Sequence, residues 1–210
     1  MGKTLALTLS IVLRCETSHW IVADGRSLKM KKPRSGLALV AALLLTVIPA
    51  SRASAHSLGG RFPYTRGQWL YLPYTAFAPY SYYPYEVQAA SNWYNTPTRM
   101  WPYRTADYNI SRLDFYQGNY GTAWWGLTIH HPCSGSGCVY VYADLYLNQQ
   151  SLGSESANTR TKVATHEMGH GLELAHPAWW DTAIMQQGYV PFTTPRNHDI
   201  NDVNIDYPYS

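Results

Sequence analysis

The chain has 210 residues, 46% of them hydrophobic and 14% charged, which suits one ordinary globular domain. Its formal net charge of +3 is concentrated at one end, because residues 1–55 hold eight of the 16 Lys and Arg residues but only two of the 13 Asp and Glu residues. The rest of the chain therefore has a net charge of about −3, and this lack of basic surface argues against a nucleic acid partner.

Residues 30–55 have the order of features that is typical of a secretory signal peptide. A basic head (MKKPR, residues 30–34) precedes an apolar run over residues 37–50, and the small residues Ala53-Ser54-Ala55 offer a cleavage site. The apolar run is shorter than the ~20 residues that a membrane-spanning helix needs. We therefore predict a secreted, extracellular protein that starts at or near His56 and keeps no membrane anchor after processing.

Residues 1–29 precede the basic head, whereas a signal peptide begins at or near the initiator methionine. We interpret them as an upstream extension caused by a misassigned start, with Met30 as the true start. The alternative is a genuine extended leader. In either case these residues, Cys15 included, should be absent from the mature protein, whose folded domain comprises residues 56–210.

The folded domain should begin with a strand at residues 68–77 and continue with a helix at residues 82–96. In this helix, Val87, Ala90 and Tyr94 recur at helical spacing. Aromatic and β-branched residues then fill three segments that are separated by turn clusters. We expect a sheet strand in each of them: residues 105–117, 122–131 and 138–148.

Two cysteines, Cys133 and Cys138, lie in the folded domain within the sequence CSGSGC. An oxidising exterior permits them to pair across this short Gly/Ser loop. The alternative is a metal knuckle, but two thiolates make an incomplete zinc site and the sequence has no second Cys pair. We therefore predict a local disulfide.

A second helix should follow a segment rich in Gly, Ser and Asn, with Ser156 or Asn158 as its N-cap. It carries the sequence HEMGHGLELAH, which starts at His166. His166 and His170 are four residues apart, so both imidazoles project from one helix face and can reach one metal ion. Glu167 lies beside them, where it can accept a proton from metal-bound water.

Two residues compete for the place of the third metal ligand. His176, ten residues beyond His166, can return to the metal if the helix ends in a sharp turn. Three neutral imidazoles would then leave the fourth tetrahedral position open, as in catalytic zinc sites. Glu173 is the competitor, because it shares a helix face with His166 and His170. Three ligands along one helix would spread over roughly 10 Å of rise, so we expect His176 to be the ligand.

This pattern resembles the metzincin clan of zinc peptidases, and within it the matrixin-like members. The resemblance rests on the spacing HExxHxxxxxH and on Met185, nine residues after His176 in DTAIMQQG, which is similar to the Met-turn. The tail HDINDVNIDYPY is similar to the acidic start of the last matrixin helix. The likeness covers most of residues 66–208, and residues 166–188 carry its specific part.

The resemblance implies an α+β, zincin-like catalytic domain with a twisted, mainly parallel sheet, an antiparallel edge strand, an active-site helix and a C-terminal helix. It implies one catalytic Zn²⁺ ion bound by His166, His170 and His176, with Glu167 as general base and Met185 as an apolar floor beneath the zinc. The implied function is that of an endopeptidase that cleaves extended peptide or protein substrates. We expect a monomer.

Three features depart from the matrixin pattern. Glu173 occupies the turn position at which the family has Gly, and a bulky residue in a left-handed conformation costs roughly 1–2 kcal/mol. The start of the folded domain contains no cysteine switch. No Tyr lies two residues after Met185, so we assign no side chain as a transition-state stabiliser there.

Further expectations concern the neighbours of the motif. Residues 139–148, just before the active-site helix, should be the edge strand that pairs with a substrate. Trp179 and Trp180 fit a wall of the pocket and packing filler about equally well. Calcium is an open alternative without a supporting pattern, because the scattered acids fit helix-start and surface positions better: Asp199, Asp202 and Asp206.

Two other functions stay open at this point. One is a zinc hydrolase that acts on a bond other than a peptide bond, and the other is a zinc-containing binding or adhesion module without turnover. Glu167 favours an enzyme, because a structural zinc site needs no carboxylate beside its ligands.

Overall fold

The computed structural model describes residues 57–208, except residues 77–80, 122 and 136. The expected signal peptide, its cleavage site, the start at His56 and the upstream extension all lie outside these residues. None of the helices in the described part is long and apolar enough to span a membrane.

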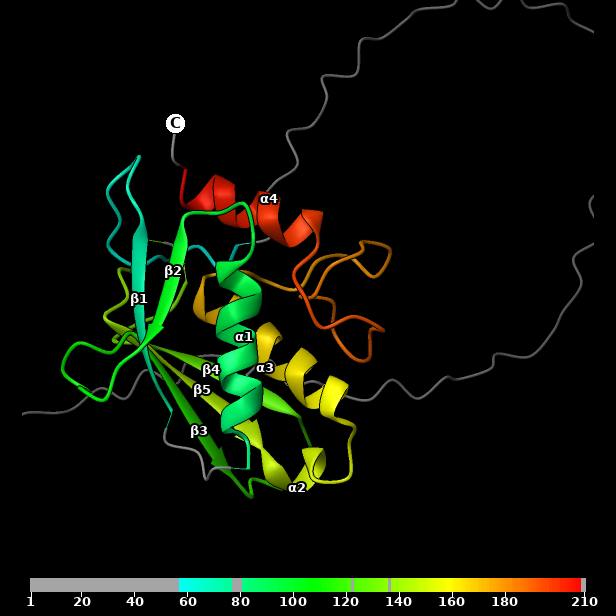
Figure 1. Ribbon diagram of the computed structural model, residues 1–210. Helices are drawn as coiled ribbons and strands as arrows, with labels where there is room; N and C mark the ends of the chain where they lie inside the picture. The colour runs from blue at the N-terminus through cyan, green and yellow to red at the C-terminus, as the bar shows by residue number, and fades with distance from the viewer. Residues whose placement is uncertain (1–56, 77–80, 122, 136, 209–210) are drawn as a thin grey trace, which may run out of the picture. The chain divides into compact units, whose positions relative to one another are not determined.

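A five-stranded sheet organises the described residues (Figure 1). Its strand order is β2-β1-β3-β5-β4. Four strands are parallel, and β4 alone runs antiparallel to its neighbour β5. The bounds are β1 (Leu70–Ala76), β2 (Met100–Arg104), β3 (Leu113–Gly118), β4 (Gly126–His131) and β5 (Tyr142–Asn148). The predicted α+β class, with a mainly parallel sheet and an antiparallel edge strand, is confirmed.

The predicted identity of the edge strand is wrong. Strand β5, within the segment 139–148, is hydrogen-bonded to β3 on one side and to β4 on the other, so it is internal. Its buried side chains Ala143, Leu145 and Leu147 fit that position. The antiparallel edge strand is β4, and β2 forms the other edge of the sheet.

The disulfide predicted in this loop is present. Cys133 and Cys138 are bonded, with their Cα atoms 6.0 Å apart. The bond closes the loop that connects the two antiparallel strands, and so it restrains the position of β4 relative to β5.

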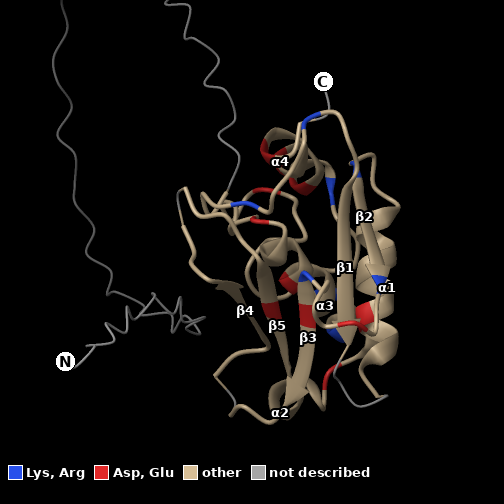
Figure 2. Cartoon of the chain, turned by 90° about the vertical axis from the view of Figure 1, so that its left-hand side faces the viewer, with Lys and Arg blue, Asp and Glu red and all other residues tan. Residues whose placement is uncertain are grey.

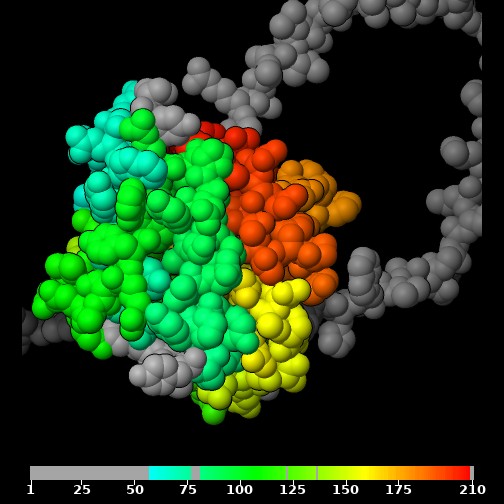
Figure 3. All heavy atoms as spheres, in the orientation of Figure 1, coloured from blue at the N-terminus to red at the C-terminus, as the bar shows by residue number. Residues whose placement is uncertain are grey.

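The described residues form four helices, α1 (Tyr83–Tyr94), α2 (Gln149–Leu152), α3 (Ala157–Gly171) and α4 (Asn197–Asp206). Helices α1 and α3 lie side by side against one face of the sheet (Figure 1). The core between these layers includes Leu72, Phe115 and Leu145 from the strands, Trp93 from α1 and Met168 from α3. Figure 3 shows the segment of α4 and its preceding loop, in red and orange, packed beside α1 and α3.

The face predicted for α1 is partly wrong. Ala90 is buried, but Val87 is half-buried and Tyr94 is exposed. The Asn92 amide is buried because it donates hydrogen bonds to α3 and to the loop before α4. A hydrophobic pattern cannot show a helix face that includes polar side chains, as this one does: Glu86, Ala89, Ala90, Asn92 and Trp93.

Two short elements and one loop were not predicted. Strand β2 contains Pro102, which a sheet tolerates at its edge because the missing N–H is not needed there. Helix α2 is a single turn after β5. Residues 105–112 form turns instead of a strand, and the Asp107 carboxylate accepts a hydrogen bond from the backbone N–H of Asn109 (2.9 Å).

Candidate metal centre

Helix α3 presents the first two histidines from its buried side. The helix starts where predicted, with Ser156 as N-cap: its Oγ accepts a hydrogen bond from the backbone N–H of Thr159 (3.1 Å). One turn of helix separates His166 from His170, and the two rings lie 4.7 Å apart between centroids. The helical spacing thus brings both imidazoles to one place.

Backbone carbonyl groups orient both rings. Nδ1 of His166 lies 2.8 Å from the carbonyl oxygen of Ile184, and Nδ1 of His170 lies 2.7 Å from that of Leu174. A carbonyl oxygen only accepts, so each Nδ1 carries the proton and donates it. The lone pair of each Nε2 is therefore available to a metal ion, which is the usual arrangement around a metal-binding histidine.

A tight turn ends α3 and returns the chain to the site. The backbone N–H of Leu174 donates to the carbonyl of Gly169 (3.0 Å), and that of Glu173 donates to the carbonyl of His170 (2.8 Å). This pair of bonds defines a Schellman motif, in which the residue after the C-cap adopts a left-handed conformation. That residue is Glu173, with φ of 88°.

Beyond the turn, His176 meets the two histidines of the helix. Its Nε2 atom lies 3.0 Å from Nε2 of His166 and 3.1 Å from Nε2 of His170. Three nitrogens on a tetrahedral zinc ion, with Zn–N distances of about 2.0–2.1 Å, would lie roughly 3.3 Å apart. Among the described residues, these three form the one group of three or more His, Cys, Asp or Glu side chains that could hold a metal ion.

Glu173, the competing ligand, is directed elsewhere. Its Oε1 atom accepts a hydrogen bond from the backbone N–H of Gly60 (2.5 Å). The chain turns at Glu173 instead of continuing the helix, so the carboxylate does not share a face with the histidines. The sharp turn inferred from the sequence is present, with glutamate in the left-handed position.

The protonation of the three imidazoles suits a metal ion. Burial lowers the pKa of all three, and the nearby Lys162 ammonium contributes in the same direction. The pKa of His170 falls to about 3. The rings are therefore neutral around neutral pH, which is the form that binds a metal. Zinc fits this set of donors, because three neutral nitrogen ligands leave a fourth position open.

Glu167 follows His166 in α3, and the edge strand β4 holds its side chain. Thr128 Oγ1 donates to Glu167 Oε2 (2.9 Å) and also lies 3.0 Å from the Glu167 carbonyl oxygen. Gly126 leaves room for the carboxylate, because a Cβ atom there would lie 2.3 Å from Glu167 Oε1. Burial raises the pKa of Glu167 to about 7, against the opposing effect of the Thr128 hydrogen bond. The carboxylate can therefore exchange a proton near neutral pH.

Met185 packs against α3 at Gly169. It is buried, and its sulfur occupies the space that a side chain at Gly169 would need, 2.3 Å from an ideal Cβ position. The backbone N–H groups of Ile184 and Met185 donate to the carboxylate of Asp199 at the start of α4 (2.7 and 3.1 Å). The loop under the histidines is thus anchored by the last helix.

The interpretation of the acids of α4 as helix-start and surface residues is therefore partly wrong. Figure 2 shows several acidic positions on this helix. Asp199 and Asp202 are buried. Asp199 is also a helix-start residue, because it accepts from the backbone N–H of Arg196 (2.7 Å). Asp199 is buried because its carboxylate accepts hydrogen bonds from the backbone N–H groups of Ile184 and Met185. No local pattern in the sequence indicates these contacts.

Sequence reasoning missed two further neighbours of the histidines. Lys162, one turn before His166 on α3, is buried, and its Nζ lies 3.4 Å from His166 Nδ1. His130 of β4 donates from Nε2 to the carbonyl of His170 (2.9 Å), and burial lowers its pKa to about 4. The spacing of four residues between Lys162 and His166 could have indicated that the lysine lies on the same helix face. His130 belongs to a strand that is distant in the chain, and no spacing indicates its contact.

Trp179 and Trp180 are not packing filler. Their exposed fractions are 79% and 69%, and their rings contact each other with centroids 5.5 Å apart. They lie between His176 and Met185 in the sequence, so they stay candidates for a wall beside the metal centre.

Comparisons with known proteins give only distant likenesses. No family model and no curated protein matches the chain. Among solved structures, the chain is similar to high choriolytic enzyme 1, a hatching enzyme zinc-protease from Oryzias latipes (medaka fish), with a TM-score of 0.46 and 13% identity over 70% of this chain and 94% of that one. It is also similar to myroilysin, with a TM-score of 0.39 and 12% identity over 72% of this chain and 91% of that one. At these values the function has to be inferred from the site itself.

Proposed function

We propose that this chain is a secreted, monomeric zinc endopeptidase of the metzincin type. One observation carries the proposal: Nε2 of His176 lies 3.0 Å from Nε2 of His166 and 3.1 Å from Nε2 of His170, and the residue after His166, Glu167, is a buried glutamate. A structural zinc site has no use for a buried carboxylate beside its ligands, whereas hydrolysis needs a group that accepts a proton next to the metal.

His166, His170 and His176 would hold the zinc ion, with Met185 as the apolar support beneath them. When bound, zinc would acidify a water molecule and polarise the carbonyl group that is attacked. The Glu167 carboxylate accepts the proton of the attacking water and transfers it to the leaving amine. Thr128 keeps one carboxylate oxygen in place while the other is available for this transfer.

The edge strand β4 supports a peptide substrate. It pairs with β5 on one side, and no described strand pairs with its other side. Gly126 and Thr128 of β4 contact Glu167, so an extended peptide added along the open edge would pass close to the metal centre. Addition of a strand to an open sheet edge binds the backbone of the peptide, whatever its sequence.

The test uses the secreted protein and an unfolded protein substrate. We expect cleavage that a chelator abolishes and added zinc restores. Glu167→Gln should retain zinc, and its kcat should fall to about 1% of the wild-type value or lower, because the substitution removes the proton acceptor and leaves every metal ligand. Glu155→Gln, at a glutamate outside the site, is the matched control and should have wild-type activity.

Two results would contradict the proposal. Full activity of Glu167→Gln would exclude the proposed base. A wild-type protein that binds zinc and cleaves no member of a peptide library would point to the non-peptidase hydrolase or to the binding module.

A further inference from the structure

Glu173 stands at a turn position where glycine would be free of strain. Its φ is 88°, and its side chain is fully buried. A non-glycine residue is sterically strained in this conformation, and a carboxyl group loses hydration when it is buried. Both effects are unfavourable at the same residue, so the contacts of this carboxylate need an explanation.

The contacts lead to the first described residues of the chain. Glu173 Oε1 accepts from the backbone N–H of Gly60 (2.5 Å), and Ser57 Oγ lies 3.5 Å from the same atom. The Glu173 carbonyl accepts from the backbone N–H of Leu58 (2.9 Å), and Ser57 forms an antiparallel bridge with Leu174. Residues 57–61, which we call the lead segment, are thus docked on the turn after α3.

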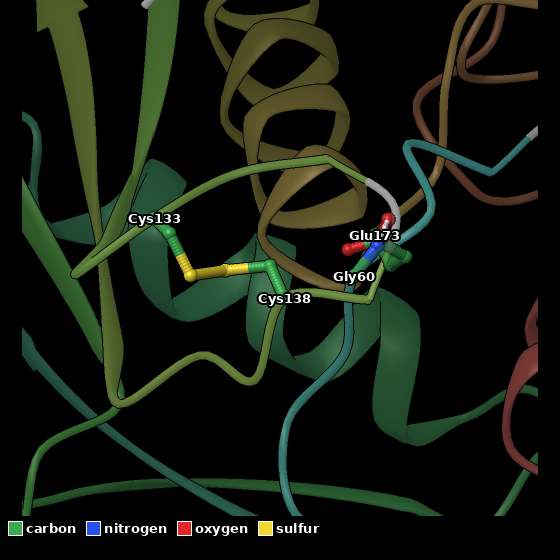
Figure 4. The surroundings of a disulfide bond; sticks show 4 residues. All are labelled: Gly60, Cys133, Cys138 and Glu173. Atoms are coloured by element: carbon green, nitrogen blue, oxygen red, sulfur yellow. Dashed lines mark hydrogen bonds between the residues drawn. A yellow bond between two sulfur atoms is a disulfide. The ribbon is translucent and has the colours of Figure 1, made fainter. Parts of the chain in front are cut away.

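The lead segment is also bound to the disulfide loop. The backbone N–H of Arg61 donates to the carbonyl of Cys138, and that of Gly137 donates to the carbonyl of Gly59 (both 2.9 Å). Figure 4 shows Gly60 and Glu173 close together beside the loop closed by Cys133 and Cys138. The lead segment therefore connects the disulfide loop to the turn.

Gly60 has no room for a side chain at this junction. A Cβ atom there would lie 2.4 Å from the Tyr140 ring, which is fully buried. Glycine thus permits the close approach by which the Gly60 N–H reaches the Glu173 carboxylate.

The same turn controls two of the three histidines. The carbonyl of Leu174, next to Glu173, accepts from Nδ1 of His170 (2.7 Å) and so sets the direction of that ring. His176 follows three residues after Glu173, so its position depends on the path of the turn. A shift of the turn would displace both imidazoles relative to His166, whose partner is the carbonyl of Ile184.

We propose that Glu173 is a positioning residue of the metal centre. Its carboxylate docks the lead segment on the turn after α3 and thereby fixes the backbone that directs His170 and His176. Glu173 itself touches neither the metal nor the substrate. This inference rests on the proposed zinc site, but its test does not use peptide cleavage.

The test compares three variants at Glu173 in the secreted protein. Glu173→Gln keeps an oxygen that can accept from Gly60, Glu173→Ala removes it, and Glu173→Gly removes it and relieves the backbone strain. The readouts are the Kd for zinc, by competition with a chromophoric chelator, and the visible absorption of the Co²⁺-substituted protein, which reports the geometry of the ligands. Circular dichroism checks that each variant is folded.

We expect Glu173→Gln to bind zinc within about threefold of the wild type and to retain its Co²⁺ spectrum, whereas Glu173→Ala and Glu173→Gly should bind zinc about tenfold or more weakly, with altered Co²⁺ bands. Because Glu173→Gly has no strained side chain, it keeps the test decisive if Glu173→Ala fails to fold.

A purely structural role predicts a different outcome. In that case Glu173→Ala and Glu173→Gly would lower the melting temperature and leave the zinc Kd and the Co²⁺ spectrum unchanged, which would overturn the proposal. A glutamine variant as impaired as the alanine variant would also overturn it, because the hydrogen bond would not be the cause. Failure of the wild type to bind zinc would instead refute the proposed function.

Discussion

Thr128 and Gly126 of β4 place the Glu167 carboxylate, whereas the loop that holds Met185 orients His166 through the Ile184 carbonyl. Thr128 contributes a hydroxyl donor to a side-chain oxygen, and Gly126 contributes the space that the carboxylate fills. Neither residue belongs to the histidine motif, which begins 38 residues after Thr128 in the chain. The chemistry proposed for Glu167 therefore depends on β4 as much as on α3.

Thr128→Val should lower kcat and leave zinc binding intact. Valine has the shape of threonine and lacks the hydroxyl, so Glu167 loses its donor and its pKa rises further above the usual range. We expect a roughly tenfold loss in kcat, comparable with other losses of a supporting hydrogen bond. Because the active form of Glu167 is unprotonated, the acidic limb of the pH profile of kcat should move to higher pH.

The matched control is Thr128→Ser, which retains the hydroxyl and should stay within about threefold of wild-type kcat. Steady-state kinetics between pH 5 and pH 9 measure both variants. Equal kcat values and pH profiles for the valine and serine variants would show that the hydroxyl has no part in catalysis.

Helix α4 acts at a distance on the site through its first turn. The Asp199 carboxylate accepts three backbone N–H groups, from Ile184, Met185 and Arg196. The carbonyl of Ile184 in turn orients His166. Helix α4 thus fixes the loop around Ile184 and Met185, and this loop orients His166 of α3.

Asp199→Ala should therefore destabilise the protein. The substitution leaves two buried N–H groups of the Met185 loop without an acceptor, and each such group costs about 1–3 kcal/mol. We expect a loss of roughly 2–4 kcal/mol in the free energy of unfolding, measured by urea denaturation with zinc present. Asn201→Ala, on the exposed side of the same helix, should change it by less than about 0.5 kcal/mol. Equal stability of the two variants would contradict this role of Asp199.

These contacts show which features a sequence can predict. Local spacing determines that His166 and His170 share a face, so this followed from the sequence, and the sequence narrowed the N-cap of α3 to Ser156 or Asn158, of which Ser156 is the cap. The contacts of Asp199, Thr128 and His130 join segments far apart in the chain, and no local pattern specifies them. The prediction that residues 139–148 form the edge strand was wrong for the same reason, because strand order in a sheet depends on pairing between distant segments.

At the scale of the whole molecule, buried ionisable groups make stability depend on pH in two directions. Burial raises the pKa of Glu86 to about 7, and neither of its carboxylate oxygens has a hydrogen-bond partner among the residues that the structure describes. A carboxyl group whose pKa is higher in the folded state contributes less stability as the pH rises from about 4.5 to about 7. The buried histidines have lowered pKa values, so they destabilise the fold as the pH falls.

Glu86→Gln isolates the first of these contributions. Relative to the wild type, the variant should gain about 2–3 kcal/mol in free energy of unfolding at pH 8 compared with pH 5, because glutamine stays neutral at both values. The histidines cancel in this difference. Urea denaturation of both proteins in the presence of a chelator measures their free energies of unfolding. If the variant and the wild type differ by the same amount at pH 5 and pH 8, the pKa of Glu86 is not raised in the folded state.

The position of β4 has a consequence for how such an enzyme would discriminate among peptides. One edge of this strand has no partner strand among the described residues, and Thr128 of the strand bonds to Glu167 while Gly126 leaves room for its carboxylate. A peptide that pairs poorly with the open edge of β4 would displace this strand and with it the Glu167 carboxylate. Poor sequences would then be turned over slowly even when they saturate the enzyme, so selectivity should be found in kcat more than in KM.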